Sequence, residues 1–175
     1  IAHVMRLKPE AVRVVPTACG GGFGGKLDLS VQPLIAIAAW KLGRPVALVY
    51  TRSESMAAST KRHPARVVAR FGCDRDGKLL ACDVRATFDT GAYASWGPTV
   101  ANRVPVHAMG PYSVPNVRTW GEAFFTNAPP SGAFRGFGVP QAAIAHEAMM
   151  DALADRLGMD RLEFRHRNAL RAGDA

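Results

Sequence analysis

The sequence predicts an α+β fold, and three observations support this class. Of the 175 residues, 48% are hydrophobic and 21% are charged, which is typical of a globular domain and excludes a disordered or collagen-like chain. Alternating β-branched residues predict strands at 65–73, 79–88 and 117–125. Apolar residues at helical spacing predict helices at 29–42 and 140–157. We therefore expect mixed strands and helices along one folded segment.

The N-terminal elements are expected to be short. Residues 1–7 keep helical spacing up to Pro9, and this helix has no N-cap, which predicts a piece of a longer polypeptide. The β-branched run Val12–Val15 predicts a strand that leads into the glycine-rich segment 20–26. The sequence thus predicts a strand, a loop and then the helix that follows.

Proline, glycine and serine indicate where the elements between residues 29 and 58 begin and end. The helix expected at 29–42 accepts a proline near its first turn and stops at Gly43. Pro45–Tyr50 has the pattern of a buried strand. Ser53 is the expected N-cap of a short helix that runs to Ala58.

A hairpin is expected in the middle of the chain. The sequence DRDG at 74–77 predicts a tight turn between the strands 65–73 and 79–88. Residues 89–91 are expected to break the second strand. The proline- and glycine-rich segment 96–115 is expected to be a long irregular loop.

The C-terminal part is expected to pair further strands and end in two helices. The strand 117–125 is followed by a second glycine loop at 133–138 and then by the helix up to residue 157. Asp160 is the expected cap of a last helix at 161–170. We therefore expect two strand hairpins interleaved with helices.

Composition also limits the function and the compartment. The charges that give the net +8 are scattered, and only 14 aromatic residues (8 Phe, 3 Trp and 3 Tyr) accompany them, so we expect no nucleic-acid partner. An anionic, phosphate-bearing ligand or an acidic partner is expected instead. The longest apolar run, 33–40, is far shorter than the roughly 20 residues of a membrane span. Three cysteines without a C-x-x-C pair, and histidines without zinc-ligand spacing, predict neither disulfides nor a metal site. We expect a cytoplasmic protein without a membrane partner.

The first glycine loop, GGGFGGK at 20–26, has more glycines than a turn requires, so we expect the backbone of Gly22, Phe23, Gly24 and Gly25 to approach a ligand. A packing role for these glycines is the alternative. The loop nearly matches the phosphate-binding pattern GxxxxGK followed by Ser or Thr, but Leu27 stands where the hydroxyl belongs. A P-loop-like nucleotide-binding protein therefore stays an alternative function.

The second glycine loop, at 133–138, contains Arg135 and Phe137. The planar guanidinium of Arg135 suits a phosphate or oxo anion, although pairing with a surface carboxylate is the alternative. Phe137 is flanked by glycines, which suits a stacking surface for a planar substrate, although a core position is the alternative.

These loops also carry a family resemblance. GGGFGGK at 20–26 and SGAFRGFGVPQ at 131–141 closely resemble the molybdopterin-binding large subunit of the xanthine dehydrogenase and aldehyde oxidase family of molybdenum hydroxylases. DTGAY at 89–93, PNVR at 115–118 and the segment 158–168 resemble further family landmarks in their usual order. The resemblance covers the whole chain.

The resemblance implies that residues 1–175 are one segment of a molybdenum-cofactor-binding domain, incomplete at both ends relative to the family. The implied reaction hydroxylates an aldehyde or an N-heterocycle with oxygen derived from water. The implied cofactor is molybdenum-molybdopterin, alone or as a dinucleotide. Iron–sulfur clusters and FAD are expected on partner domains or subunits of an oligomeric enzyme. A non-catalytic assembly module is the alternative for the isolated chain.

The resemblance assigns roles to individual residues. Gly22, Phe23, Gly24 and Gly25 are expected to contact the cofactor through their backbone, and Arg135 is expected to lie against it. No catalytic base is assigned, because the family's glutamate base is expected outside this chain, as is its cofactor-contacting glutamine.

The substrate-binding residues implied by the resemblance are Phe137, Leu27 and Arg103. Phe137 is expected to face the substrate ring. Leu27 replaces the glutamate with which purine-oxidising members bind their substrate, which favours substrates other than xanthine. Arg103 matches a substrate-binding arginine by spacing alone, and an ordinary solvated arginine is the alternative.

Overall fold

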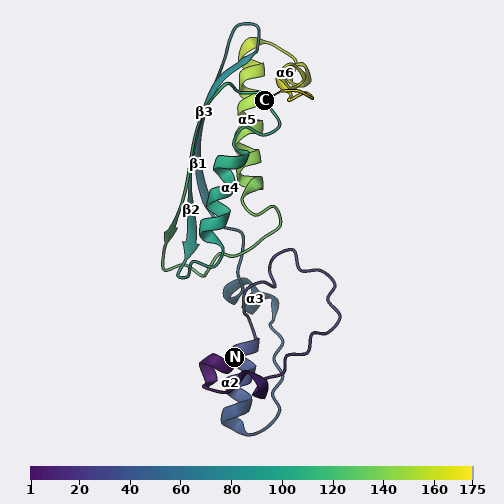
Figure 1. Ribbon diagram of the computed structural model, residues 1–175, viewed down its shortest axis with the longest axis vertical. Coiled ribbons are helices and arrows are strands. Elements are labelled where there is room, and N and C mark those ends of the chain that lie inside the picture. The colour runs from purple at the N-terminus through teal and green to yellow at the C-terminus, as the bar shows by residue number, and fades with distance from the viewer. Residues whose placement is uncertain (175) are drawn as a thin grey trace.

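The computed structural model describes residues 1–174 and forms an elongated molecule (Figure 1). A three-stranded sheet with helices α4, α5 and α6 occupies one half, and the N-terminal helices occupy the other. The N-terminus and the C-terminus lie in opposite halves. A long loop before α2 projects from the N-terminal half and extends towards the end of the sheet (Figure 1).

The sheet is mixed, with the strand order β1-β2-β3. β1 (Ala65–Cys73) and β2 (Leu79–Gly91) form the expected antiparallel hairpin, in which Ala65 is paired with Phe88. β3 (Asn116–Phe125) pairs with β2 in parallel. The α+β class is confirmed, but the expectation of a second hairpin is wrong, because the crossover through a helix brings β3 back in the direction of β2.

Helices cover one face of the sheet. α4 (Gly97–His107) and α5 (Val139–Leu157) pack on this face, and α6 (Arg161–Asn168) lies beside the end of α5 (Figure 1). Alternate residues of β2 point into the core, and Val84, Ala86 and Phe88 are fully or almost fully buried there. One core cluster joins these residues to α4, α5 and Phe137, and a second joins β2 to α5 and α6.

The N-terminal half contains α1 (Ala2–Met5), a 3₁₀ turn η1 (Pro9–Ala11), α2 (Gln32–Leu42) and α3 (Arg52–Ala58). α2 ends as expected at Gly43, whose φ of +63° is left-handed. The N-cap of α3 is Thr51 instead of the expected Ser53. Thr51 and Glu54 form a capping box, in which the Glu54 backbone N–H donates to the Thr51 hydroxyl at 3.2 Å.

Two expected strands are absent from residues 1–174. Val12–Val15 and Pro45–Tyr50 do not pair with any strand. Their β-branched residues remain largely exposed, with Val14 at 67% and Val49 at 88%. The composition favours extended backbone, but a strand also needs a partner for its N–H and C=O groups.

The segment expected to be irregular contains α4. Pro98 lies in the first turn, where a missing N–H costs nothing, and Pro105 lies near the end of the helix. The Ala101 carbonyl, four residues before Pro105, packs closely against the backbone of Gly121 in β3. β2 also continues through residues 89–91, which were expected to break it. None of the helices formed by residues 1–174 is long and apolar enough to cross a membrane.

Candidate functional site

The first glycine loop is a compact turn within the long loop before α2. The Gly25 N–H donates to the Gly22 carbonyl at 3.0 Å, and the Leu27 N–H donates to the Gly24 carbonyl at 3.1 Å. Phe23 has a left-handed φ of +50° and its side chain is 63% exposed. Such successive backbone turns direct N–H groups outward and favour an electronegative ligand.

The P-loop-like alternative does not fit this geometry. A phosphate-binding loop connects a strand directly to a helix. Here the preceding Val12–Val15 is not a strand, and α2 begins only at Gln32, six residues after Lys26.

The second glycine loop is anchored at its base by backbone hydrogen bonds. The Ser131 N–H donates to the Thr90 carbonyl at 3.1 Å, and the Gly132 N–H donates to the Lys61 carbonyl at 2.9 Å. Further along, the Phe137 N–H donates to the Phe134 carbonyl at 2.8 Å. These bonds tie the loop to the end of β2 and to the segment before β1.

The two glycine loops touch through their backbones. A Cβ atom on Gly24 would lie 2.8 Å from the carbonyl carbon and oxygen of Ala133 and 3.0 Å from the Phe134 nitrogen. The φ of Gly24 is +95°, which is also unfavourable for other residues. Only glycine therefore permits this approach, and residues more than 100 positions apart form one continuous surface.

Arg62 holds the second loop from the other side. Its guanidinium donates to the Arg135 carbonyl at 2.6 Å and lies 4.5 Å from the centre of the Phe134 ring. A cation over an aromatic face is stabilising. Arg62 was not predicted from the sequence, and no local pattern identifies it, because its partners are more than 70 residues away.

Asp28 turns away from the loop surface and into the molecule. Its Oδ1 accepts a hydrogen bond from the Ser95 hydroxyl at 2.7 Å, and its Oδ2 is buried without a hydrogen-bond partner among residues 1–174. A Cβ on Gly132 would lie 2.4 Å from that Oδ2 atom, so a second glycine is required where the loops converge. Asp28 therefore joins the first loop to the turn after β2.

Arg135 and Arg103 are both exposed, and Arg103 lies beside the second loop. A Cβ on Gly138 would lie 3.1 Å from the Arg103 Cβ. No salt bridge involving either arginine occurs in the part of the chain that the structure describes. Both arginines are therefore exposed, on residues close to the start of α5, where the helix dipole also favours negative charge.

Phe137 is half-buried and belongs partly to the core. Its φ of +51° is left-handed, and its ring meets Trp96 edge-on, with a centroid distance of 5.7 Å and an interplanar angle of 62°. Trp96 is 39% exposed. Trp96 was not predicted as a site residue, although its position just after DTGAY, in a segment expected to be a loop, was a usable signal.

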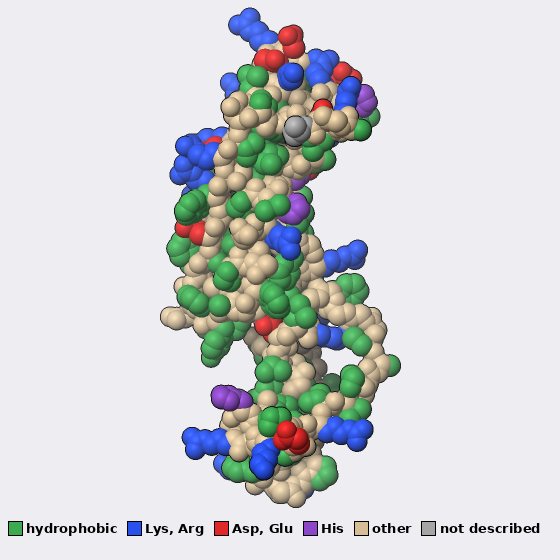
Figure 2. All heavy atoms as spheres, in the orientation of Figure 1, with side chains coloured by type: hydrophobic (Ala, Val, Ile, Leu, Met, Phe, Trp, Pro, Cys, Tyr) green, Lys and Arg blue, Asp and Glu red, His purple; other side chains and the backbone are tan. Residues whose placement is uncertain are grey.

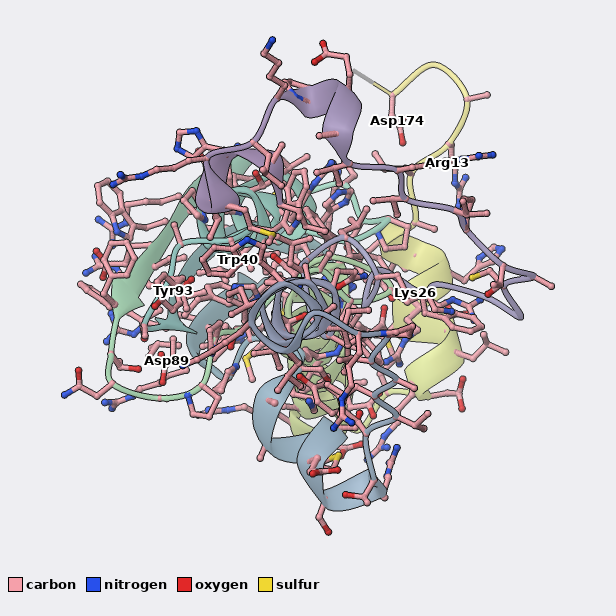
Figure 3. The ribbon with its side chains drawn as sticks, turned by 90° about the horizontal axis from the view of Figure 1, so that it is seen from below. Arg13, Lys26, Trp40, Asp89, Tyr93 and Asp174 are labelled. Atoms are coloured by element: carbon pink, nitrogen blue, oxygen red, sulfur yellow. The ribbon has the colours of Figure 1, made fainter. Side chains whose placement is uncertain are left out.

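Leu27 and Lys26 end the first loop. Leu27 is 62% exposed, and its placement on the outside of the loop leaves it available to a ligand or to another chain. Lys26 folds back over its own loop and donates hydrogen bonds to the Gly21 carbonyl and to Cys19 Sγ. Figure 3 labels Lys26 on the side of the molecule where the long loop projects outward.

The chain thus combines an α+β fold with two glycine loops in contact, and the family match gives its class as a cofactor-binding domain. The model of the molybdopterin cofactor-binding domain family matches residues 1–169, and the chain belongs to that family.

Individual relatives are similar over almost the whole chain. The nicotinate dehydrogenase large molybdopterin subunit of Eubacterium barkeri is 50% identical over 99% of this chain, and the aldehyde oxidoreductase of Megalodesulfovibrio gigas is 38% identical over 99% of it. The chain spans only 41% and 19% of these two relatives, respectively.

Solved structures share the fold. The aldehyde oxidoreductase from Desulfovibrio gigas superposes with a TM-score of 0.79 at 38% identity, over 89% of this chain and 17% of that one. The CO dehydrogenase from Oligotropha carboxidovorans superposes with a TM-score of 0.82 at 27% identity, over 97% of this chain and 22% of that one.

The glycine loops fit an anionic pterin cofactor. A Cβ on Gly20 or Gly22 would meet nothing within 4 Å, so the backbone there faces open space that a ligand can enter. Within residues 1–174, no group of three or more His, Cys, Asp or Glu side chains is placed to hold a metal ion. The donors that this chain offers are therefore backbone N–H groups and guanidinium groups, which suit the oxygen atoms and phosphate of such a cofactor rather than direct metal ligation.

Proposed function

We propose that this chain forms one wall of the active site of a molybdenum-dependent oxidoreductase that hydroxylates an aldehyde or an N-heterocycle with oxygen derived from water. The observation that carries this proposal is the backbone contact between Gly24 and Ala133, which merges the two glycine loops into one ligand-facing surface. Family membership supports the cofactor class. The names of relatives, which include a nicotinate dehydrogenase and an aldehyde oxidoreductase, support the two substrate classes.

The proposed binding residues act through their backbone and their charge. Gly22, Phe23 and Gly24 present backbone N–H groups to the cofactor, and Arg135 neutralises an anionic part of it. Gly25 lies against the cofactor without donating to it, because its N–H already donates to the Gly22 carbonyl. When bound, the cofactor supplies the two-electron oxidation of the substrate carbon. The residues of this chain bind and orient the cofactor and exclude water around it.

The proposed substrate-binding residues lie on the second loop and beside it. Phe137 offers a ring edge or face to a planar substrate, and Trp96 limits the space next to it. Arg103 offers a guanidinium to an anionic or carbonyl-bearing substrate. Leu27 contributes an apolar surface, and no residue of this chain is proposed as the catalytic base.

The proposed enzyme is larger than this chain. Its partners are domains or subunits that carry iron–sulfur clusters and FAD, which accept the electrons released by substrate oxidation. We also propose an oligomeric cytoplasmic enzyme, and residues 1–175 are proposed to be a single segment of its molybdopterin domain.

The proposal is tested on the complete molybdopterin subunit, purified with its partners. We expect molybdenum and pterin in about equimolar amounts with the subunit, and turnover of aldehydes, nicotinate or another N-heterocycle. Gly24→Ala should remove most of the bound molybdenum, because its Cβ collides with the Ala133 backbone and its φ is left-handed, at a cost of about 1–3 kcal/mol. Gly22→Ala should keep the fold but fill the space that faces the cofactor.

A matched control separates cofactor binding from folding. Gly72→Ala adds a Cβ that meets nothing within 4 Å in β1, outside both loops, and it should leave the molybdenum content unchanged. A subunit that contains no molybdenum but binds ATP would refute the proposal in favour of a nucleotide-binding protein. A molybdenum-free, inactive subunit that only assembles with its partners would refute it in favour of an assembly module.

A further inference from the structure

The side chains of Cys19 and Lys26, at the two ends of the first glycine loop, contact each other. Lys26 Nζ lies 3.0 Å from Cys19 Sγ, and both side chains are exposed. The Gly21 carbonyl accepts a hydrogen bond from each of them, with the Cys19 thiol at 3.3 Å. The three groups therefore form a closed polar triangle that spans Gly20–Gly25.

The surroundings of Cys19 differ from those of the other two cysteines. The Lys26 ammonium donates to the sulfur and lowers the pKa of the Cys19 thiol. Burial raises the pKa of Cys73 and of Cys82 instead. Because the thiolate is the form that reacts with oxidants, and Cys19 is exposed whereas Cys82 is buried, we expect Cys19 to be the most reactive thiol of the three.

We propose that Cys19 and Lys26 form an oxidation site, at which peroxide joins Cys19 Sγ to Lys26 Nζ through one bridging oxygen atom. One thiol and one amine react with two molecules of hydrogen peroxide, giving the S–O–N bridge and three molecules of water. The S–H bond and one N–H bond break, and one S–O bond and one O–N bond form. The sulfur and the nitrogen together lose four electrons, which reduce the two peroxide molecules. The first step is the oxidation of the thiolate to a sulfenic acid.

The bridge closes a ring around the glycine loop. Gly21, Phe23 and Gly24 have left-handed backbone conformations with φ of +122°, +50° and +95°, so the loop conformation is sharply defined. A covalent link between its two ends restricts the alternatives open to the loop and stabilises this conformation. Reduction by a thiol reverses the link and releases the loop.

Peptide mass spectrometry tests the proposal on the complete molybdopterin subunit, with and without hydrogen peroxide. The expected product is a Cys19–Lys26 cross-link with a mass increase of about 14 Da, one oxygen gained and two hydrogens lost, that disappears after dithiothreitol. Iodoacetamide should alkylate Cys19 at least about tenfold faster than Cys73 and Cys82 in the unoxidised protein. These readouts do not use enzyme activity, so they are independent of the function proposed above.

Two variants separate activation of the thiol from bridging. Lys26→Arg keeps a positive charge beside Cys19 but has no primary amine, so Cys19 should remain the fastest thiol while the cross-link disappears. Cys19→Ser should abolish both the fast alkylation at position 19 and the cross-link. Oxidation of Cys19 that stops at a sulfenic or sulfinic acid in the unmodified protein, or preferential oxidation of Cys73 or Cys82, would overturn the proposal.

Discussion

Leu27 directly follows the first glycine loop, and its side chain is 62% exposed. An apolar side chain leaves the polar edge of a purine without a hydrogen-bond partner, which costs about 1–3 kcal/mol of binding free energy. We therefore predict that the complete enzyme oxidises an aldehyde with a higher kcat/KM than xanthine. Leu27→Glu should raise kcat/KM for xanthine relative to kcat/KM for the aldehyde by about tenfold, measured by steady-state kinetics.

Leu29→Glu, at a residue that is 70% exposed, is the control and should leave the ratio of the two kcat/KM values unchanged. A preference for xanthine in the unmodified enzyme would contradict the prediction.

Phe137 is the residue at which core packing and substrate contact compete. Its ring packs on the core cluster and lies edge-on to Trp96. If the exposed part stacks on substrate, Phe137→Leu should preserve most of the packing while removing the ring. We predict a roughly 2- to 10-fold loss of kcat/KM for planar aromatic substrates relative to small aliphatic aldehydes. Equal losses for both substrate classes, together with a lower melting temperature, would assign Phe137 to the core alone.

The residues of the two loops could be predicted from the sequence, because their glycine-rich segments form a local pattern. Arg62 could not be predicted, since its contact with the second loop joins residues that are far apart in the sequence. Trp96 was not predicted either, although its position just after DTGAY was a signal; its contact with Phe137 becomes visible only in the fold. The helix predicted from residue 29 begins only at Gln32, so Asp28 precedes it. The hydrogen bond from the Ser95 hydroxyl to Asp28 joins residues that are far apart in the sequence, and no local pattern predicts it.

At the level of secondary structure, α6 depends on a local signal that the sequence displays. Asp160 Oδ1 accepts hydrogen bonds from the Leu162 and Glu163 N–H groups, both at 2.9 Å. Asp160→Ala should lower the free energy of unfolding by about 1 kcal/mol, as measured by urea denaturation. Asp160→Asn should retain most of the stability, because an amide oxygen also caps. Glu10→Ala, far from α6, is the control, and an equal loss in that variant would argue against a capping role.

The elements that were predicted correctly are bounded by local signals in their own sequence, such as a turn motif or a capping residue. The β1–β2 hairpin has a DRDG turn, and α5 and α6 have a first-turn proline and a capping aspartate. The errors arose where an element depends on distant partners. α4 contains two prolines and is held by its packing on β3, while Val12–Val15 has strand composition but lacks a neighbouring strand. Whether β3 pairs in parallel or antiparallel also depends on the crossover, which local residues do not specify.

Across the whole molecule, two buried histidines make folding depend on pH. His63 is 3% exposed and His146 is 5% exposed, and burial lowers the pKa of both side chains below 6.5. The folded state thus favours the neutral form of each. Their contribution to stability is fully present above the unfolded-state pKa of about 6.5 and is lost as the pH falls below it, because the unfolded chain then binds protons more strongly.

We predict that the free energy of unfolding changes little between pH 8 and pH 7 and falls below about pH 6.5, with a limiting slope of about 1.4 kcal/mol per pH unit for each histidine. Urea denaturation at several pH values measures this dependence of the free energy of unfolding on pH. The double variant His63→Gln and His146→Gln should lose this decrease between pH 6.5 and 5, although it is less stable at pH 8. A decrease of the same size in the double variant would assign the effect to other groups.

The core is unevenly distributed along the chain. Every buried residue described by the structure lies between His63 and Asn168. The N-terminal half instead exposes apolar side chains, which Figure 2 shows in green around its lower end. On α2, Leu34, Ile37 and Trp40 recur at helical spacing and are 52%, 44% and 71% exposed. An uncovered apolar stripe of this kind favours association.

We therefore predict that the 175-residue chain alone associates with itself in a concentration-dependent manner, as measured by light scattering. Trp40→Lys should weaken this association, because it places a charge in the apolar stripe of α2. Trp120→Lys is the matched control. Trp120 is also well exposed, at 60%, but its neighbours on the open sheet face include Arg66, Arg85 and Arg118. A charge among those arginines removes little apolar contact, so association should persist. A monodisperse monomer at all concentrations, or equal effects of the two substitutions, would show that the stripe on α2 does not drive association.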